Sequence, residues 1–451
     1  MKGGGKTAAS HLLYRMSARV AIYTLGCKVN AADSDVLAAA FQQKGYTIAQ
    51  FNEPSDIYII NTCTVTHEAD AQCRQVIRQV RSRNPDAFVA VVGCYAQANP
   101  DVIKSIPGID LILGNSEKFS IFKYLDSCRK NAEPIVKIDS FRDVFSVEQG
   151  LPSSTYRTRA FLKVQDGCTY KCSYCIVPMV RGPSSSRSKD DILDKIIFLR
   201  DEGYKEIVLT AVNLGEYRFT DDYRLFDLLK NISKIHGVPR IRLTSIEPNC
   251  VTEELVRYIS ESVIICHHFH IPLQSGSDDV LKRMRRRYLT KRYTQVMEWI
   301  TKYIPNAGIG ADVMVGFPGE TEEHFLQTET FIKEMPLTYL HVFRYSPRAG
   351  TDASTLGENV PPHIMHERSK RLIELGKLKK ETFLYRQIGL THEVLFETKR
   401  KDSAFGGWTR NYARVNCTGD GLHNSFKMIK ITDVKENYLI GEMIGKNSFD
   451  R

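Results

Sequence analysis

Three closely spaced cysteines constrain this chain most strongly. Cys168, Cys172 and Cys175 form a C-x3-C-x2-C motif, and no further cysteine or histidine follows before His236. Thiolates at such spacing select zinc or an iron–sulfur cluster. A structural zinc site has four protein ligands, and an electron-transfer cluster usually has four cysteines. Three thiolates around a four-iron cube leave one iron open, so the motif predicts a cluster that binds a further molecule.

Secretion and membrane insertion are both disfavoured. The first 20 residues lack the sustained apolar run of an export signal. The 11 cysteines of this 451-residue chain are odd in number, which argues against a disulfide framework. No stretch approaches the roughly 18 apolar residues of a membrane span. We therefore expect a cytoplasmic protein, and the net charge of +10 favours an anionic partner.

The first 130 residues alternate short apolar runs with amphipathic stretches, which predicts an open parallel α/β sheet. Cys27, Cys63 and Cys94 each lie one to three residues beyond a predicted strand. Because carboxyl ends of parallel strands face one crevice, we expect these cysteines to share a second cluster. Three separately buried thiols are the alternative. The predicted strands are Arg19–Thr24, Asp56–Ile60, Ala87–Val92 and Leu111–Leu113.

The middle of the chain predicts a partial (β/α)6 barrel, whose active face is formed by the loops after its strands. Cys168 follows the first strand, Asn213 the second, Glu247 the third and Gln274 the fourth, while Asp312 lies within the fifth. The repeated placement favours a ligand lining. The strands expected are Ala160–Gln165, Glu206–Ala211, Ile241–Ile246, His268–Leu273, Gly310–Val315 and Tyr339–Arg344.

The C-terminal region predicts a small antiparallel β-barrel with strands at Thr391–Glu397, Tyr412–Val415, Met428–Thr432 and Tyr438–Met443. Trp408, Arg410, Tyr412 and Arg414 alternate, so a continuous strand would place all four side chains on one face. Such a face suits stacking on unpaired bases and neutralising phosphates. Aromatics of an edge strand that pack on a neighbouring loop are the alternative.

Several motifs together resemble the radical S-adenosylmethionine (SAM) methylthiotransferases. They are TLGCKVN at 24–30, NTCTVT at 61–66, VVGCYAQ at 91–97 and KVQDGCTYKCSYCIVP at 163–178. The resemblance implies a cluster domain at 18–135, a radical-SAM domain at 154–385 and a TRAM-like RNA-binding domain at 386–447. It also implies two 4Fe–4S clusters, held by Cys27, Cys63 and Cys94 and by Cys168, Cys172 and Cys175. The Gly-rich start predicts a disordered N-terminal extension at 1–17.

The resemblance extends to the other candidate ligands. TAVNLG at 210–215, TSIEP at 244–248, HIPLQSGSD at 270–278 and ADVMVGFPGET at 311–321 are similar to the family's SAM-contacting strand ends. We therefore expect SAM contacts from Asn213, Ser245, Glu247, Gln274 and Asp312, with structural hydrogen bonding as the alternative. Ala211 stands where members of this family usually have glycine.

Two basic features are candidate RNA or anion contacts, with solvated faces as the alternative. They are Arg74 and Arg78, which lie on one side of a helix with Arg81, and the basic run 282–287.

The implied reaction is methylthiolation of carbon 2 of an adenosine beside the tRNA anticodon. One SAM would methylate a sulfur at the first cluster, and another would yield the radical that removes the hydrogen. Lys28-Val29-Asn30 is similar to the branch acting on N6-threonylcarbamoyladenosine. The alternatives are isopentenyladenosine, a ribosomal protein side chain, or a non-enzymatic iron–sulfur RNA-binding protein. We expect a monomer that receives electrons from a flavodoxin or ferredoxin.

Overall fold

The computed structural model describes residues 18–125, 133–139, 143–147, 158–399, 404–419 and 421–444. The extension predicted at 1–17 lies outside these residues. The chain forms two compact units. The N-terminal unit extends to residue 154 and also includes residues 177–185, and the C-terminal unit comprises residues 155–176 and 186–451. Among the described residues, no helix has the length and apolar character needed to cross a bilayer.

The N-terminal unit is built on a six-stranded parallel sheet of order β2-β1-β3-β4-β5-β6. The chain leaves β1 for β2 on one side and returns to β3 on the other, so β1 and β3 flank a topological switch point, where open α/β sheets bind ligands. The strands are β1 (Arg19–Thr24), β2 (Thr47–Ala49), β3 (Ile57–Thr62), β4 (Phe88–Gly93), β5 (Leu111–Leu113) and β6 (Ile135–Lys137).

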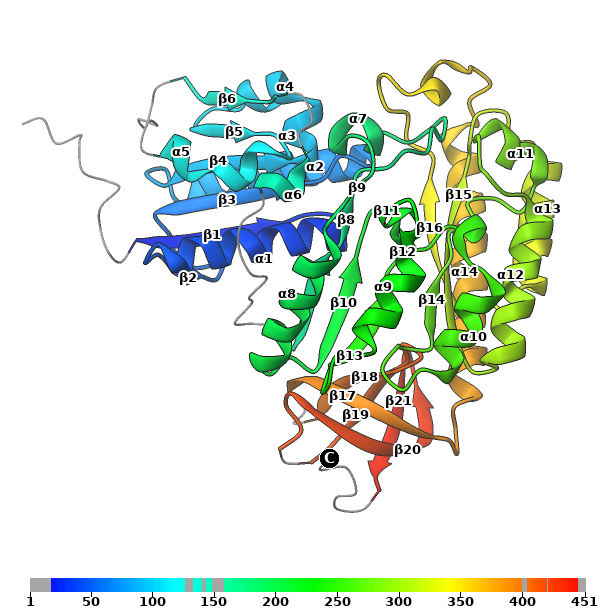
Figure 1. Cartoon of the computed structure of the whole chain (residues 1–451). Coiled ribbons are helices and arrows are strands. Elements are labelled where there is room, and N and C mark those ends of the chain that lie inside the picture. The colour runs from blue at the N-terminus through cyan, green and yellow to red at the C-terminus, as the bar shows by residue number, and fades with distance from the viewer. Residues whose placement is uncertain are drawn as a thin grey trace, which may run out of the picture. The chain divides into compact units, whose positions relative to one another are not determined.

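Helices cover both faces of this sheet (Figure 1). Alternate strand residues face opposite sides, so Ile57 and Ile59 pack with α1, whereas Tyr58 and Ile60 pack with α2. The helices are α1 (Lys28–Gln43), α2 (His67–Arg83), α3 (Cys94–Ala98), α4 (Pro100–Lys104), η1 (Glu117–Ser120), α5 (Phe122–Leu125), α6 (Val144–Val147) and α7 (Val177–Arg181). The helix α7 belongs to this unit although it follows the C-x3-C-x2-C motif in the chain.

The C-terminal unit contains the expected partial barrel of six parallel strands surrounded by helices (Figure 1). Two three-stranded sheets, β13-β10-β7 and β14-β15-β16, are joined by parallel bridges between Ile241 and Ile265 and between Ser245 and His270. The strands are β7 (Arg159–Lys163), β10 (Glu206–Thr210), β13 (Arg240–Leu243), β14 (His268–His270), β15 (Gly308–Val315) and β16 (Tyr339–Arg344), with a short β8 at Gln165–Asp166 and a ribbon of β11 (Arg218–Thr220) and β12 (Tyr223–Arg224).

The outer faces of these strands and the surrounding helices enclose the largest apolar core. Ile207, Leu209, Ile241 and Leu243 belong to this core and are at most 2% exposed. The helices are α8 (Lys189–Asp201), α9 (Leu225–Ile232), α10 (Glu253–Glu261), α11 (Asp278–Arg283), α12 (Thr290–Tyr303), α13 (Glu322–Glu334) and α14 (Pro362–Tyr385), with 3-10 turns η2 (Leu214–Glu216), η3 (Pro248–Cys250) and η4 (Asp352–Thr355).

The inner faces of the strands are polar. Glu206 on β10 is fully buried and accepts hydrogen bonds from Arg240 (2.6 Å) and Arg242 (2.8 and 3.0 Å) on β13. These two guanidinium groups and Arg159 hold the pKa of the Glu206 carboxyl far below its usual range, against the opposing effect of burial. The strand period of two therefore separates an apolar outer face from a charged interior.

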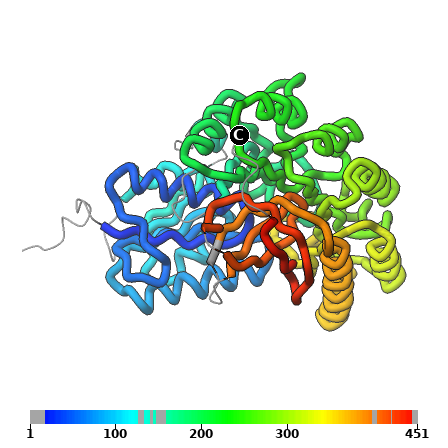
Figure 2. Tube along the Cα trace, turned by 90° about the horizontal axis from the view of Figure 1, so that it is seen from below, coloured from blue at the N-terminus to red at the C-terminus, as the bar shows by residue number. Residues whose placement is uncertain are grey.

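The chain ends in a closed barrel of five strands, ordered β17-β18-β19-β21-β20. Figure 2 shows α14, in orange, beside this barrel, in darker orange and red. Of the four strands expected, the one at Tyr412–Val415 is wrong in position, and one strand was missed. The strands are β17 (Thr391–Lys399), β18 (Phe405–Thr409), β19 (Arg414–Cys417), β20 (Ser425–Lys435) and β21 (Tyr438–Met443). Gly406 and Gly407 obscured β18, because glycine is depleted in strands.

Candidate functional site

The first cysteine set lies at the carboxyl ends of three adjacent strands. Cys27 follows β1 and is the N-cap residue of α1, Cys63 follows β3, and Cys94 begins α3 directly after β4. Burial, together with the neighbouring Cys94, raises the pKa of the Cys63 thiol to about 12. Three thiolates therefore repel one another here unless a cation lies among them. This is the expected property of a metal-binding thiol set.

Two glycines allow the cysteine loops to approach each other. Gly26 has φ +97°, and a Cβ there would lie 2.8 Å from the Cys63 sulfur. Gly93 has φ +95°, and a Cβ there would lie 2.5 Å from the Asn61 side-chain oxygen. Both positions require left-handed backbone and the absence of a side chain. The glycines of the TLGC and VVGC motifs are thus needed for the geometry of the thiols.

A buried charge network lies beside this cysteine set. Lys118 and Asp33, both fully buried, form an ion pair at 2.6 Å, and Arg181 of α7 also contacts Asp33, at 3.2 Å. Lys118 donates to the Asn115 oxygen at 2.9 Å, and the Asn115 amide nitrogen lies 3.6 Å from the Cys94 sulfur. Cys27 is exposed, and the Arg181 guanidinium opposes the rise in pKa that desolvation of its sulfur produces. The network places positive charge near the thiols.

The second cysteine set lies in the loop after the first barrel strands. Cys168, Cys172 and Cys175 are all partly exposed. The Cys168 sulfur accepts a hydrogen bond from the Tyr170 backbone at 3.4 Å. Burial, with the nearby Glu216 carboxylate, raises the pKa of the Cys168 thiol well above its usual value. Cys168, like Cys63, is therefore a neutral thiol unless a cation lies beside it.

Arg286 joins this cysteine set to a predicted SAM contact. Its guanidinium donates to the Cys172 sulfur at 3.1 Å and to the Glu247 carboxylate, and its side chain is 4% exposed. Burial raises the pKa of Glu247, and Arg286 opposes that shift. The sequence alone provides no reason to single out Arg286 from the other residues of the basic run 282–287. No periodic signal separates it from its neighbours Lys282, Arg283 and Arg285, which form exposed ion pairs instead.

The other predicted SAM contacts lie at or near the same strand ends. Asn213 accepts from the Gly215 backbone, and its buried amide nitrogen makes no hydrogen bond. Gln274 has φ +63°, a strained conformation for a side chain of its size, and such strain concentrates at functional sites. Ser245 forms an isolated bridge with His270. Asp312 has two histidine partners: its Oδ1 atom lies 3.0 Å from His270 Nε2 and 3.2 Å from His341 Nδ1.

Both cysteine sets fit a multi-iron cluster better than a single metal ion. Four-coordinate zinc, with zinc–sulfur bonds of about 2.3 Å, brings its sulfur ligands to within about 4 Å of one another. Among the residues that the structure describes, neither cysteine set brings its three sulfur atoms within 4.8 Å of each other. Wider spacing suits ligands that bind separate corners of a cluster. Cys27, Cys63 and Cys94 could hold one cluster, and Cys168, Cys172 and Cys175 another.

The predicted strand face for RNA is wrong. Thr409 and Ala413 close a hairpin turn, in which the Tyr412 backbone has φ +66°, so Trp408 and Arg414 lie on different strands. Arg410 is held by three backbone carbonyls, those of Ser262, Val263 and Ile265. The sequence period of two is interrupted by the turn, and the four side chains do not share an exposed face.

This hairpin docks on the partial barrel, where the barrel strands begin. Arg242 donates to the Thr409 carbonyl at 3.0 Å, and its guanidinium lies over the Tyr412 ring, 4.9 Å from the centroid. The Tyr412 ring also packs on His268 with centroids 4.5 Å apart. A Cβ on Gly308 would lie 2.0 Å from the Asn411 carbonyl oxygen, so this glycine permits the docking. Arg410 and Tyr412 thus hold the two parts of the C-terminal unit together.

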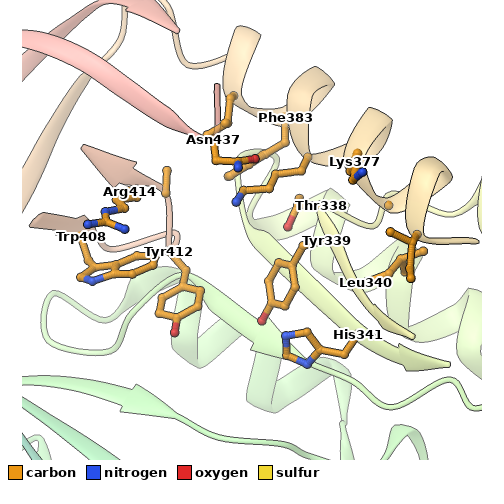
Figure 3. Close-up of a pocket in the computed structure, with 15 residues that line it drawn as sticks. Thr338, Tyr339, Leu340, His341, Lys377, Phe383, Trp408, Tyr412, Arg414 and Asn437 are labelled. Carbon is orange, nitrogen blue, oxygen red and sulfur yellow. The ribbon is translucent and has the colours of Figure 1, made fainter. Parts of the chain in front are cut away.

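A cavity of about 430 Å³ lies between β16, α14 and the hairpin (Figure 3). Its aromatic side chains include Trp408, which stacks on Tyr412 with centroids 4.5 Å apart. Its basic side chains are the exposed Lys377 and Arg414 and the half-buried Lys380. Three of the predicted RNA contacts, Trp408, Tyr412 and Arg414, therefore do line one site, together with two lysines that sequence reasoning missed.

The predicted RNA contacts on α2 are only partly exposed. Arg78 is exposed, whereas Arg74 is half-buried and donates to the Tyr95 hydroxyl at 2.8 Å. Arg81 donates to the Ala87 carbonyl at 3.1 Å. Two of the three arginines thus have protein partners, which neither the RNA prediction nor the alternative of a solvated face included.

The partial barrel with its three-cysteine loop defines a radical-SAM fold, and comparisons with known proteins agree. Residues 162–332 match the model of the radical SAM superfamily, and residues 19–114 match a family described as uncharacterized protein family UPF0004. A solved radical SAM methyltransferase, TsrM of Kitasatospora setae, has a TM-score of 0.55, with 14% identity and 73% of each chain covered. That likeness supports the fold.

Whole-length relatives identify the family. The chain is 39% identical to the threonylcarbamoyladenosine tRNA methylthiotransferase MtaB of Bacillus subtilis, covering 94% of this chain and 96% of that protein. It is 34% identical to a tRNA-2-methylthio-N(6)-dimethylallyladenosine synthase of Desulforamulus reducens, covering 94% and 95%. The chain belongs to the radical-SAM tRNA methylthiotransferase family. Members of this family use SAM and carry two 4Fe–4S clusters, which the two cysteine sets fit.

Proposed function

We propose that this protein adds a methylthio group to carbon 2 of N6-threonylcarbamoyladenosine beside the tRNA anticodon. The observation that carries the proposal is the pair of three-cysteine sets, each at strand carboxyl ends. The choice of base is supported by the 39% identity to MtaB of Bacillus subtilis over nearly the full length of both chains. The relative that acts on dimethylallyladenosine is less similar, at 34%.

In this proposal the cysteines hold the two clusters, and other side chains position SAM. When bound, the clusters and SAM supply the one-electron and sulfur chemistry that an unactivated C–H bond requires. Asn213 offers its unpaired amide nitrogen, and Gln274 is presented by a strained turn. Ser245 and Glu247 complete the set, with Arg286 holding Glu247 in place. Asp312 belongs to the same lining, although histidines are its present partners.

The tRNA would contact the cavity of Figure 3 through Trp408, Arg414, Lys377 and Lys380. Aromatic rings beside cations suit unpaired bases and their phosphates. Arg78, and less directly Arg74, remain candidates for a second contact on α2. We further propose a cytoplasmic monomer reduced by a flavodoxin or ferredoxin.

The substrate is tested by mass spectrometry of tRNA nucleosides from cells with and without this gene. Loss of the methylthio group from threonylcarbamoyladenosine supports the proposal. Loss from isopentenyladenosine instead would establish the alternative branch, and unchanged tRNA would contradict both.

The role of the cysteines is tested with the purified, reconstituted protein. Cys168→Ala should abolish SAM cleavage, whereas Cys417→Ala, which removes a buried thiol in β19, should retain it. Wild-type protein should contain about eight irons per chain. Zinc with little iron, or SAM cleavage by the Cys168→Ala variant, would contradict the radical mechanism.

A further inference from the structure

Three metal-ligating side chains, none of them a cysteine, converge within the partial barrel. His270 on β14, Asp312 on β15 and His341 on β16 come from three adjacent strands, and each points one ligand atom toward the others. The His270 Nε2 atom lies 3.0 Å from Asp312 Oδ1, and the His341 Nδ1 atom lies 3.2 Å from the same oxygen. All three ligand atoms lie within 4.8 Å of one another.

Hydrogen bonding accounts for only one of the two ring nitrogens of His270. The Nδ1 atom lies 3.3 Å from the Tyr339 hydroxyl, which orients the ring. The buried Nε2 atom lies 3.0 Å from Asp312 Oδ1 but is not aligned for a hydrogen bond to it. A nitrogen in this position beside a carboxylate and a second histidine is available to bind a cation.

We propose that His270, Asp312 and His341 form a site for one divalent transition-metal ion of the zinc, iron or cobalt class. Two histidines and one carboxylate on one side of an ion are the facial arrangement that such metals accept. Metal–ligand bonds of about 2.0–2.1 Å place tetrahedral ligand atoms about 3.3 Å apart, close to the two separations found.

The residues around these three side chains also have properties expected near a metal ion. Tyr339 orients the ring of His270 through the nitrogen that faces away from the metal, as partners of metal-binding histidines commonly do. The same hydroxyl is 2.8 Å from His268 Nε2, which fixes it in turn. The side chains of Asp312 and His341 are 24% and 53% exposed. An ion with these three protein ligands therefore keeps open positions, where an oxygen-bearing ligand can bind.

The site is tested on the full-length, tag-free protein after both clusters have been reconstituted, so that the six cluster cysteines are occupied. Zinc or cobalt(II) is added, excess is removed, and bound metal is measured by inductively coupled plasma mass spectrometry. We expect one zinc or cobalt per chain beyond the cluster iron. Bound cobalt should show the absorption of nitrogen and oxygen ligands without the charge-transfer band of thiolates.

His341→Gln and Asp312→Asn should each weaken this binding at least tenfold while leaving the cluster iron content unchanged. His363→Ala removes an exposed histidine at the start of α14 and should leave binding unchanged. Unchanged iron content in the two variants shows that loss of the extra ion is not a folding defect. Wild-type protein that binds no extra ion, or variants that bind it equally well, would overturn the proposal in favour of a hydrogen-bonded side-chain network.

Discussion

The guanidinium of Arg286 donates to the Cys172 sulfur over 3.1 Å, so a buried cation contacts one of the three thiols of the radical-SAM motif. The same guanidinium binds Glu247. One side chain therefore links a cluster ligand to a candidate SAM contact, and both partners lose their counter-charge when it is removed.

Replacing Arg286 should destabilise the protein and impair SAM cleavage. Arg286→Ala leaves Glu247 buried without its partner, and breaking a buried ion pair typically costs about 3–5 kcal/mol. We expect a lower urea midpoint and at least a tenfold loss of 5′-deoxyadenosine formation. Arg283→Ala, which removes an exposed ion pair with Glu358, is the matched control and should change neither. Equal effects of the two substitutions would contradict this role.

Gly26 should be required for the first cluster alone. In Gly26→Ala the new Cβ meets the Cys63 sulfur at 2.8 Å with φ +97°, so the thiol must move. Iron content should fall from about eight to about four per chain, and SAM cleavage should persist. Gly45→Ala has a similar φ of +86° with nothing within 4 Å, and it should keep all its iron. Retention of eight irons by Gly26→Ala would show that the crowding is relieved elsewhere.

Arg414 and Arg410 should differ in their effects on tRNA binding. Arg414 is exposed at the cavity of Figure 3, so Arg414→Ala should weaken tRNA binding. The slope of the logarithm of the binding constant against the logarithm of the salt concentration should become shallower by about 0.7, the value for one contact to a single strand. Arg410 is bound by three carbonyls, so Arg410→Ala should lower stability by about 1–3 kcal/mol instead. Filter-binding titrations at several salt concentrations and urea denaturation separate the two. A larger change in salt dependence for Arg410→Ala would restore the original strand-face hypothesis.

Glu320 should make stability fall as pH rises. Burial raises the pKa of this carboxyl to about 7, despite a hydrogen bond from the Gly316 backbone. The folded protein therefore binds a proton that the unfolded chain, with a glutamate pKa of about 4.3, has released. The contribution of this proton to the free energy of unfolding is fully present below about pH 4 and is lost as pH rises through about 7. The change is on the order of 3 kcal/mol. Urea denaturation from pH 5 to 8 should show a shallower decline in Glu320→Gln, and parallel curves would disprove the assignment.

The features that could be predicted from the sequence are those set by hydrophobic periodicity and by the positions of strand ends. The bounds of β1, β5, β16 and β21 were as expected, and the partial barrel and the parallel sheet were confirmed. Features set by tertiary contacts were not visible. A left-handed Tyr412 reverses the chain where alternation suggested a strand, and Arg286 differs from the other basic residues of its run only through burial against Cys172.

The membership of α7 in the N-terminal unit sets a limit on how this protein can be taken apart. A fragment that stopped at residue 154 would contain all of Cys27, Cys63 and Cys94, yet it would lack Arg181, a cation that contacts the buried Asp33 at 3.2 Å. The N-terminal unit therefore cannot be separated from the rest of the chain by a single cut. To build the first cluster site into another protein, residues 177–185, which follow the radical-SAM motif in the chain, have to be included with residues 18–125.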